Sequence, residues 1–133
     1  AELWVGDLSA PRVQAFDAAT GARLAELAID SIAIRVLASP DGRTIATSNI
    51  GRGSISLIDA ATRTLTRTIT VSGDPAAGQV TLLFSADGKR IYAAETGRDQ
   101  VAEIDLATGT VLRRLSAGKN GDGLAIAPAK PTN

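Results

Sequence analysis

The 133-residue sequence contains no cysteine and no histidine. Without cysteine the chain has no disulfide, thiolate nucleophile, iron–sulfur ligand or cysteine-type zinc site. Without histidine it has no Ser-His-Asp triad, and it lacks the usual metal ligand and general base of neutral pH. Any chemistry that this chain carries alone therefore depends on Asp, Glu, Lys, Arg, Tyr or a bound cation.

Charge of one sign, aromatic side chains and long apolar runs are also scarce. The 14 Lys and Arg residues balance 14 Asp and Glu, which disfavours non-specific nucleic-acid binding because that needs many cations on phosphates. Aromatic residues make up 3% of the chain, so packing must rely on small aliphatic side chains. No apolar run approaches the roughly 20 residues of a membrane-spanning helix. The 44% apolar content excludes a disordered chain, and we expect one domain over residues 1–133.

One segment of the sequence recurs three times. Residues 13–21 (VQAFDAATG) reappear as 55–63 (ISLIDAATR) and 101–109 (VAEIDLATG). Between these copies lies a turn marker, SPDG at 39–42 and SADG at 85–88. Each unit holds four short runs rich in Thr, Ile, Val and Leu, which favour strands. In the middle unit these runs fall at 34–38, 44–48, 54–58 and 65–71.

Four strands in a unit of about 40–45 residues are typical of a β-propeller blade. With the strands of a blade named A to D from the channel outward, the chain reads BCD-ABCD-ABCD-A. The sequence therefore predicts an all-β fold with three blades' worth of antiparallel strands. The first unit combines residues 1–30 with a terminal strand at 122–128, and the others span 31–73 and 74–118.

In these motifs the chain resembles the YVTN-type β-propeller repeat, which is related to quinoprotein-dehydrogenase-like propellers. The matching segments are LWVGD at 3–7, SPDG at 39–42, ISLID at 55–59 and IYAAE at 91–95. The resemblance covers almost the whole chain and implies a fold more than a function. Related propellers include exported binding or surface proteins, subunits of quinoprotein amine dehydrogenases, haem-binding domains and lactonases.

The resemblance also implies how the ends of the chain are used, because in the family a terminal A strand pairs with the B strand at the other end. Propellers have 4–8 blades, so three do not close a ring. Either two chains exchange terminal strands and form a six-bladed homodimer, or the chain is part of a longer or engineered propeller. We expect the homodimer. Ala1-Glu2 suits the residue after signal-peptide cleavage, so we expect a periplasmic or extracellular protein.

Propeller ligands bind at the channel mouth, on the face that carries the D–A and B–C loops. Three acceptors there occupy equivalent positions, ten residues before each repeated aspartate, and either cap loop N–H groups or bind a cation or an amine. Two arginines, also equivalent, either neutralise these acids or hold an anion. No cofactor is expected, although the Gly-Asp-Gly segment at 121–123 could approach Ca²⁺. The candidate ligand-binding residues are Asp7, Asn49, Arg52, Glu95, Arg98, Lys119 and Asp122.

The sequence leaves three functions open. The first is a non-enzymatic binding or scaffold module that takes a ligand or a protein partner at the channel mouth. The second is an enzyme or enzyme subunit: a lactonase-like hydrolase with a carboxylate-bound cation, or a quinoprotein amine dehydrogenase-type subunit. The third is a propeller fragment without independent activity. A convergent acidic cluster would favour the enzyme, whereas loops without one would favour the binding module.

Overall fold

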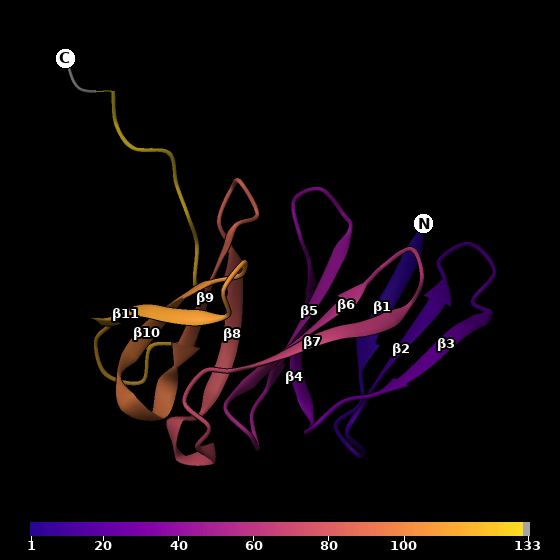
Figure 1. The fold of residues 1–133 in the computed structure, drawn as a ribbon, viewed down its shortest axis with the longest axis horizontal. Helices are drawn as coiled ribbons and strands as arrows, with labels where there is room; N and C mark the ends of the chain where they lie inside the picture. The colour runs from indigo at the N-terminus through magenta and orange to yellow at the C-terminus, as the bar shows by residue number, and fades with distance from the viewer. Residues whose placement is uncertain (132–133) are drawn as a thin grey trace.

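The computed structural model describes residues 1–131 and consists of β-strands joined by turns, with two three-residue 3-10 helices. The strands form three antiparallel sheets that lie side by side in chain order (Figure 1). The first sheet contains β1 (Glu2–Gly6), β2 (Arg12–Asp17) and β3 (Arg23–Ala28). The second contains β4 (Ala33–Ala38), β5 (Thr44–Asn49), β6 (Ser54–Asp59) and β7 (Thr64–Thr70). The third contains β8 (Gln79–Phe84), β9 (Arg90–Glu95), β10 (Gln100–Asp105) and β11 (Thr110–Ser116).

The strands agree with the predicted order BCD-ABCD-ABCD, and in the middle unit each bound lies within one residue of the expected run. The 3-10 helix η1 (Pro75–Ala77) lies in the connection between β7 and β8, and η2 (Thr96–Arg98) follows β9. The final strand expected at 122–128 is not formed in the single chain, where residues 121–131 carry no regular secondary structure. A strand requires a hydrogen-bonded neighbour; Gly121 and Asp122 accept hydrogen bonds from the side chains of Thr96 and Thr81, and the end of the chain extends away from the sheets (Figure 1).

The repeated aspartates shape the turn between strands C and D. Asp17 accepts hydrogen bonds from the backbone N–H groups of Ala19 and Thr20, at 2.9 and 2.8 Å. Asp59 and Asp105 bond the corresponding threonine N–H groups. The backbone bonds from Thr20 and Ala19 lower the pKa of Asp17 below its ordinary value. These aspartates therefore serve the turns, which is why they recur in every unit.

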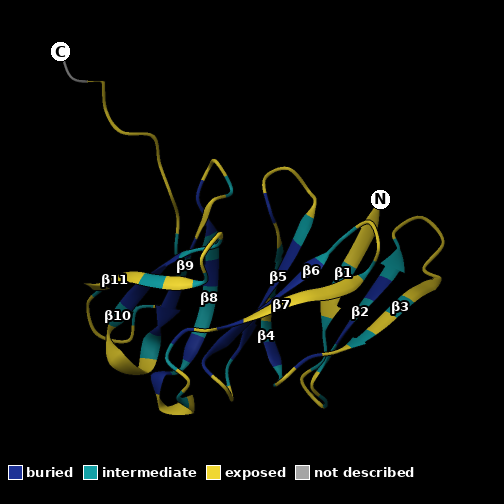
Figure 2. Ribbon diagram, in the orientation of Figure 1, coloured by how far each residue is buried: buried dark blue, intermediate teal, exposed yellow. Residues whose placement is uncertain are grey.

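The inner strands β5 and β6 of the middle sheet are buried on both faces because the sheet lies between the other two, whereas its outer strand β7 is exposed (Figure 2). One apolar cluster joins the first and second sheets and includes Val13, Ile45 and Ile58, with Trp4 packed against it. A second cluster joins the second and third sheets through residues such as Ala46, Leu82 and Ile91. Along a B strand, therefore, alternate side chains contact the preceding and the following sheet.

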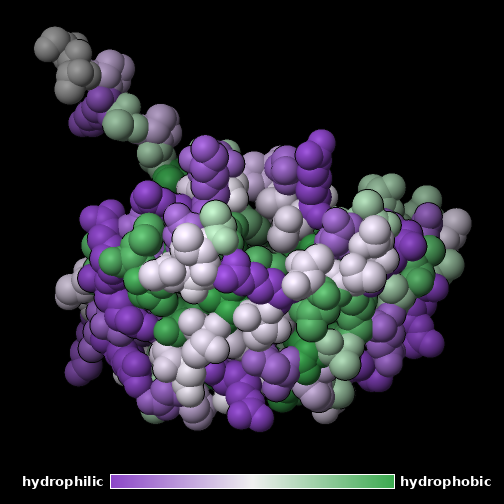
Figure 3. Space-filling view, viewed as in Figure 1, coloured by the Kyte–Doolittle hydropathy of each residue, from purple (hydrophilic) through white to green (hydrophobic). Residues whose placement is uncertain are grey.

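On the face seen in Figure 3, hydrophobic and hydrophilic side chains are interspersed over all three sheets. Within residues 1–131, no helix has the length and apolar character needed to span a membrane.

Candidate functional site

The first predicted acceptor, Asp7, follows β1 and is held by its own loop. Its carboxylate accepts from the Ser9 hydroxyl at 2.5 Å, the Ser9 backbone N–H at 2.7 Å and Arg12 Nε at 2.6 Å. The two bonds from Ser9, followed by the bond from Arg12, lower the pKa of Asp7 to about 2. The group is therefore ionised at neutral pH, and its acceptor capacity is used in ordering the turn between strands B and C.

The second acceptor, Asn49, ends β5 and is fully buried. Its amide Nδ2 lies 2.8 Å from Asp30 Oδ1 and 2.8 Å from Ser56 Oγ, while its Oδ1 accepts from the Thr47 hydroxyl at 2.7 Å. Ser54 Oγ also donates to the Asp30 carboxylate. Asn49 thus links the D–A connection at Asp30 to the end of the B strand and fixes these loops. The amide nitrogen and oxygen of Asn49 are already used in hydrogen bonds within the chain.

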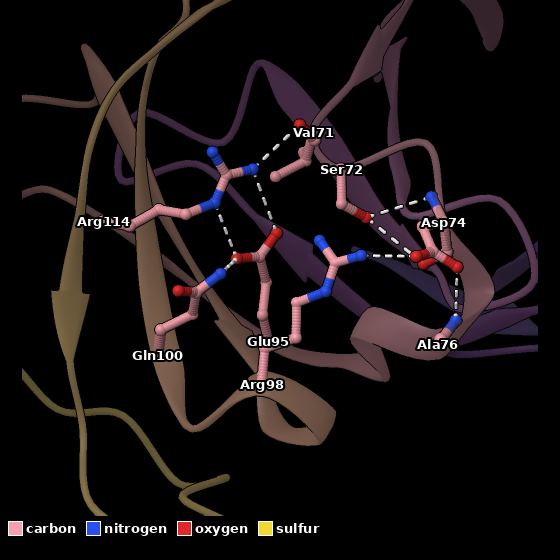
Figure 4. A network of polar contacts seen from close by, with 8 residues as sticks. All are labelled: Val71, Ser72, Asp74, Ala76, Glu95, Arg98, Gln100 and Arg114. Carbon is pink, nitrogen blue, oxygen red and sulfur yellow. Dashed lines mark hydrogen bonds and ion pairs between the residues drawn. The ribbon is translucent and has the colours of Figure 1, made fainter.

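The third acceptor, Glu95, is the centre of the network drawn in Figure 4. Arg114 Nε and Nη2 lie 2.9 and 3.3 Å from its two carboxylate oxygens, and Gln100 Nε2 lies 2.6 Å from Oε2. Arg114 Nη2 also donates to the Val71 carbonyl in the connection that leaves the second sheet, at 3.1 Å. Glu95 is completely buried. The arrangement locks the second and third sheets together at the loop end.

The predicted cations lie in the same group of loops, but they do not neutralise the three acceptors. Arg98 pairs instead with Asp74, whose side chain also caps η1. Arg52 lies in the loop after β5 and is exposed, as is Lys119 in the segment after β11. Asp122 accepts from the Thr81 hydroxyl at 2.5 Å and lies 3.9 Å from Arg35 Nη2. The loop end thus carries exposed cations around a set of acids that are already paired.

Chemically, this end of the molecule is a preorganised polar surface. In the part of the chain that the structure describes, no three acidic side chains gather as a metal ion would require. The Gly-Asp-Gly segment places the Asp122 carboxylate against Thr81 and Arg35. The acids that could act as a general acid or base are held by hydroxyl, amide or guanidinium donors.

Gln79, which the sequence analysis missed, is fully buried beneath the loops that join the second and third sheets. Its Nε2 donates to the Ser54 carbonyl at 2.7 Å and to Ser48 Oγ at 3.1 Å. Among the described residues, its Oε1 has no hydrogen-bond partner. The sequence carried a signal for this residue, because the equivalent position in the preceding unit is the apolar Ala33.

A second missed feature is Glu103, which is buried on the outer face of the third sheet. Arg113 Nε and Arg90 Nη1 each lie 2.5 Å from its carboxylate oxygens. The bond from Arg113, followed by that from Arg90, lowers the pKa of Glu103. The sequence did carry a signal, because the equivalent position is Leu57 in the second unit and Ala15 in the first.

A hollow lies at the opposite end, between the first and second sheets. It encloses about 630 Å³ and is bordered by Trp4 on β1 and by Val36, Leu37 and Ala38 on β4. Arg43 and Asp59 add charge at its rim. None of the predicted ligand-binding residues lines this cavity. The structure therefore separates a polar loop end from an apolar groove beside β1.

No protein-family model and no curated protein matches the sequence. Two solved structures are similar in fold. Hydrazine synthase from Kuenenia stuttgartiensis superposes with a TM-score of 0.75 and 26% sequence identity, over 86% of this chain and 33% of that one. The dihydro-heme d1 dehydrogenase NirN, solved in complex with DHE, gives a TM-score of 0.69 and 23% identity, over 88% and 26%.

This chain thus spans about a third and a quarter of the length of those two chains. Both are β-propeller proteins, and the similarity covers 86% and 88% of this chain. The structure is all-β, and its three sheets are blades of a β-propeller.

Proposed function

We propose that this chain is a non-enzymatic binding or scaffold module, with a ligand or protein partner taken up by the D–A and B–C loops. The observation that carries the proposal is the pairing of the equivalent acceptors. Asp7, Asn49 and Glu95 each make hydrogen bonds within the chain that hold a loop in place. A surface fixed in this way suits recognition, because little conformational freedom is lost when a ligand binds.

The charge that remains available at this end is cationic. Arg52 and Lys119 are exposed, and no ion pair involving either residue occurs within residues 1–131. A ligand that carries carboxylate groups is therefore the first class to test, since guanidinium and ammonium groups bind carboxylates through charge-assisted hydrogen bonds.

The test is a titration of the ¹⁵N-labelled chain with citrate, followed by NMR. We expect saturable shifts of amides in residues 50–53, 96–99 and 118–122, and an Arg52→Gln variant should bind more weakly. The matched control is Arg43→Gln, which removes an exposed arginine at the opposite end of the sheets. Shifts spread over both ends, or equal effects of the two variants, would contradict the proposal.

A second function is supported by the comparisons, since both similar structures carry the names of enzymes. In this alternative the chain is the propeller portion of a larger enzyme or an enzyme subunit, and the reacting groups belong to another part of the assembly. Because one of those structures holds a haem-related ligand by its printed name, titration with haem is the direct test. A saturable shift of the haem absorbance band would favour this alternative.

A further inference from the structure

The outward face of the first sheet is uncovered at positions that are buried in the other two sheets. On β1, the side chains of Leu3 and Val5 are 57% and 40% exposed. Their repeat equivalents Ile45 and Thr47 on β5 are 4% and 0% exposed, and Ile45 belongs to the apolar cluster that joins the first and second sheets. The same strand pairs with β2 along one edge, and its other edge has no strand beside it in the described structure.

The cavity beside β1 occupies the place where the repeat puts an A strand. In the second and third sheets, β4 and β8 pair with the B strands β5 and β9. On the first sheet the corresponding space is the hollow of about 630 Å³ between Trp4 and β4. An extended segment paired with β1 would therefore fill an existing groove without displacing another element.

The chain itself contains a segment with the required pattern. Residues 121–126 align with β4 and β8, which places Leu124 and Ile126 at the positions of Leu82 and Phe84, two buried core residues. Ile126 is 52% exposed. The connection of residues 117–120 has four residues, as does the connection of residues 29–32 between β3 and β4.

The third sheet carries an arginine whose equivalent in the second sheet binds the C–D turn of the next sheet. Arg67 on β7 reaches the next C–D turn, where its guanidinium donates to the carbonyls of Leu106 at 3.1 Å and Thr108 at 2.7 Å. Arg113 stands at the equivalent position on β11, and its Nε bonds Glu103. Hydrogen bonds from its two terminal nitrogens are absent from residues 1–131.

The first C–D turn is the matching receptor. A Cβ added to Gly109 in the third turn would collide with the Arg67 guanidinium, whereas one added to Gly21 in the first turn would meet nothing within 4 Å. Both glycines have a positive φ, of 70° and 74°, so the two turns have the same form. The space beside the first turn is therefore free for the guanidinium of an arginine such as Arg113.

From these features we infer that the outward face of the first sheet binds a second copy of this chain. The partner's third sheet packs on it, the partner's Arg113 binds the turn at Gly21, and the partner's segment 124–127 pairs with β1.

The register of β8 on β9 pairs Leu82, Leu83 and Phe84 with Ala93, Tyr92 and Ile91. The repeat then places the partner's Leu124 opposite Val5, the partner's Ala125 opposite Trp4 and the partner's Ile126 opposite Leu3. Two copies make six blades, within the 4–8 of closed propellers, and each contact forms twice around a two-fold axis.

Native mass spectrometry of the purified chain tests the inference. We expect a species at twice the 13.6 kDa chain mass, formed at micromolar concentration. Leu3→Lys and Ile126→Glu should each weaken the dimer by about tenfold or more, because each buries an unpaired charge between strands. Leu65→Lys is the control: it changes a 41% exposed leucine on the outermost strand of the middle sheet and should leave the dimer unchanged.

Mixing the Leu3→Lys and Ile126→Glu variants distinguishes association through the paired strands from non-specific hydrophobic association. In the mixture, one interface joins an unaltered β1 to an unaltered segment 124–127, while the other places the new lysine opposite the new glutamate. Opposite charges directly across two strands attract, so the mixture should form a heterodimer more tightly than either variant forms its own dimer. Arg113→Gln gives a further check at the other contact and should weaken the dimer.

Three outcomes would overturn the inference. One is a wild-type chain that stays monomeric at every concentration, and another is an assembly of three or more copies. The third is a dimer that Leu3→Lys and Ile126→Glu leave unaffected. None of these outcomes bears on the citrate titration, since the cationic loop residues of the proposed ligand site are present in the single chain.

Discussion

Replacing Arg114 with methionine should destabilise the chain more than any change to an exposed ion pair. The Glu95 carboxylate is completely buried, and Arg114 supplies two of its three hydrogen bonds. The substitution keeps much of the side-chain volume but leaves the carboxylate with Gln100 alone. It also removes the bond from Arg114 to the Val71 carbonyl, which links the second and third sheets.

The expected size follows from the burial of the two partners. Removing one member of a buried ion pair costs about 3–5 kcal/mol. The side chain of Arg114 is 35% exposed and water can replace part of its contact, so we expect about 2–3 kcal/mol. For a domain of this size that corresponds to a fall in Tm of about 6–12 °C.

Urea denaturation followed by circular dichroism measures this change. The control is Arg23→Met, which breaks an exposed pair with Glu26 and should change the free energy of unfolding by less than about 0.5 kcal/mol. The double variant Glu95→Leu with Arg114→Met removes both charges and should recover most of the loss. A loss below about 0.5 kcal/mol in Arg114→Met, or a double variant less stable than the single one, would refute the reasoning.

Three further changes probe the loops. The pKa of Asp7 is lowered to about 2, so its contribution is present above the unfolded value of about 4 and is lost as pH falls from about 4 toward 2. Asp7→Asn should therefore flatten the decline of the urea midpoint over that range, and an unchanged decline would refute the assignment. Gly53→Ala should cost more than Gly42→Ala, as measured by Tm. Both glycines have a positive φ, which costs a non-glycine residue about 1–2 kcal/mol, but a Cβ at Gly53 would also collide with Ser72. Asn49→Asp should lower stability at pH 7 by about 2 kcal/mol, because it places a carboxylate against Asp30 in a buried site; the loss should shrink on acidification, and a pH-independent loss would contradict this.

Much of the fold could be predicted because turn chemistry and strand pattern repeat. Asp17 and its equivalents mark the C–D turns, and each bonds the backbone two or three residues on, as a local turn requires. Arg63 stands where the other turns have glycine, yet it adopts the same positive φ, of 54°. The terminal strand could not be confirmed in the same way, because pairing of residues 124–127 depends on a neighbour that the pattern alone does not supply.

The sequence predicted where the candidate residues lie in the fold, but not which hydrogen-bond partners they have. The spacing correctly placed Asp7, Asn49 and Glu95 at equivalent ends of B strands. The long-range partners of Asn49 and Glu95 come from segments that carry no repeated signal: Arg114 is one of two adjacent arginines on an outer strand, and Asp30 lies in a connection of variable length. Long-range polar pairs of this kind depend on how the sheets pack, which strand periodicity does not determine.

The sheet topology has a consequence for how the chain acquires its structure. Within each sheet, the described strands pair only with their neighbours in sequence, so each sheet is a self-contained meander. Contacts of low sequence separation form fast, and units that contact only their neighbours open and close semi-independently. During synthesis the first sheet can form before the second has left the ribosome, and the second can form before the third. Hydrogen exchange should then resolve three steps of protection rather than one, with the deepest protection in the central sheet.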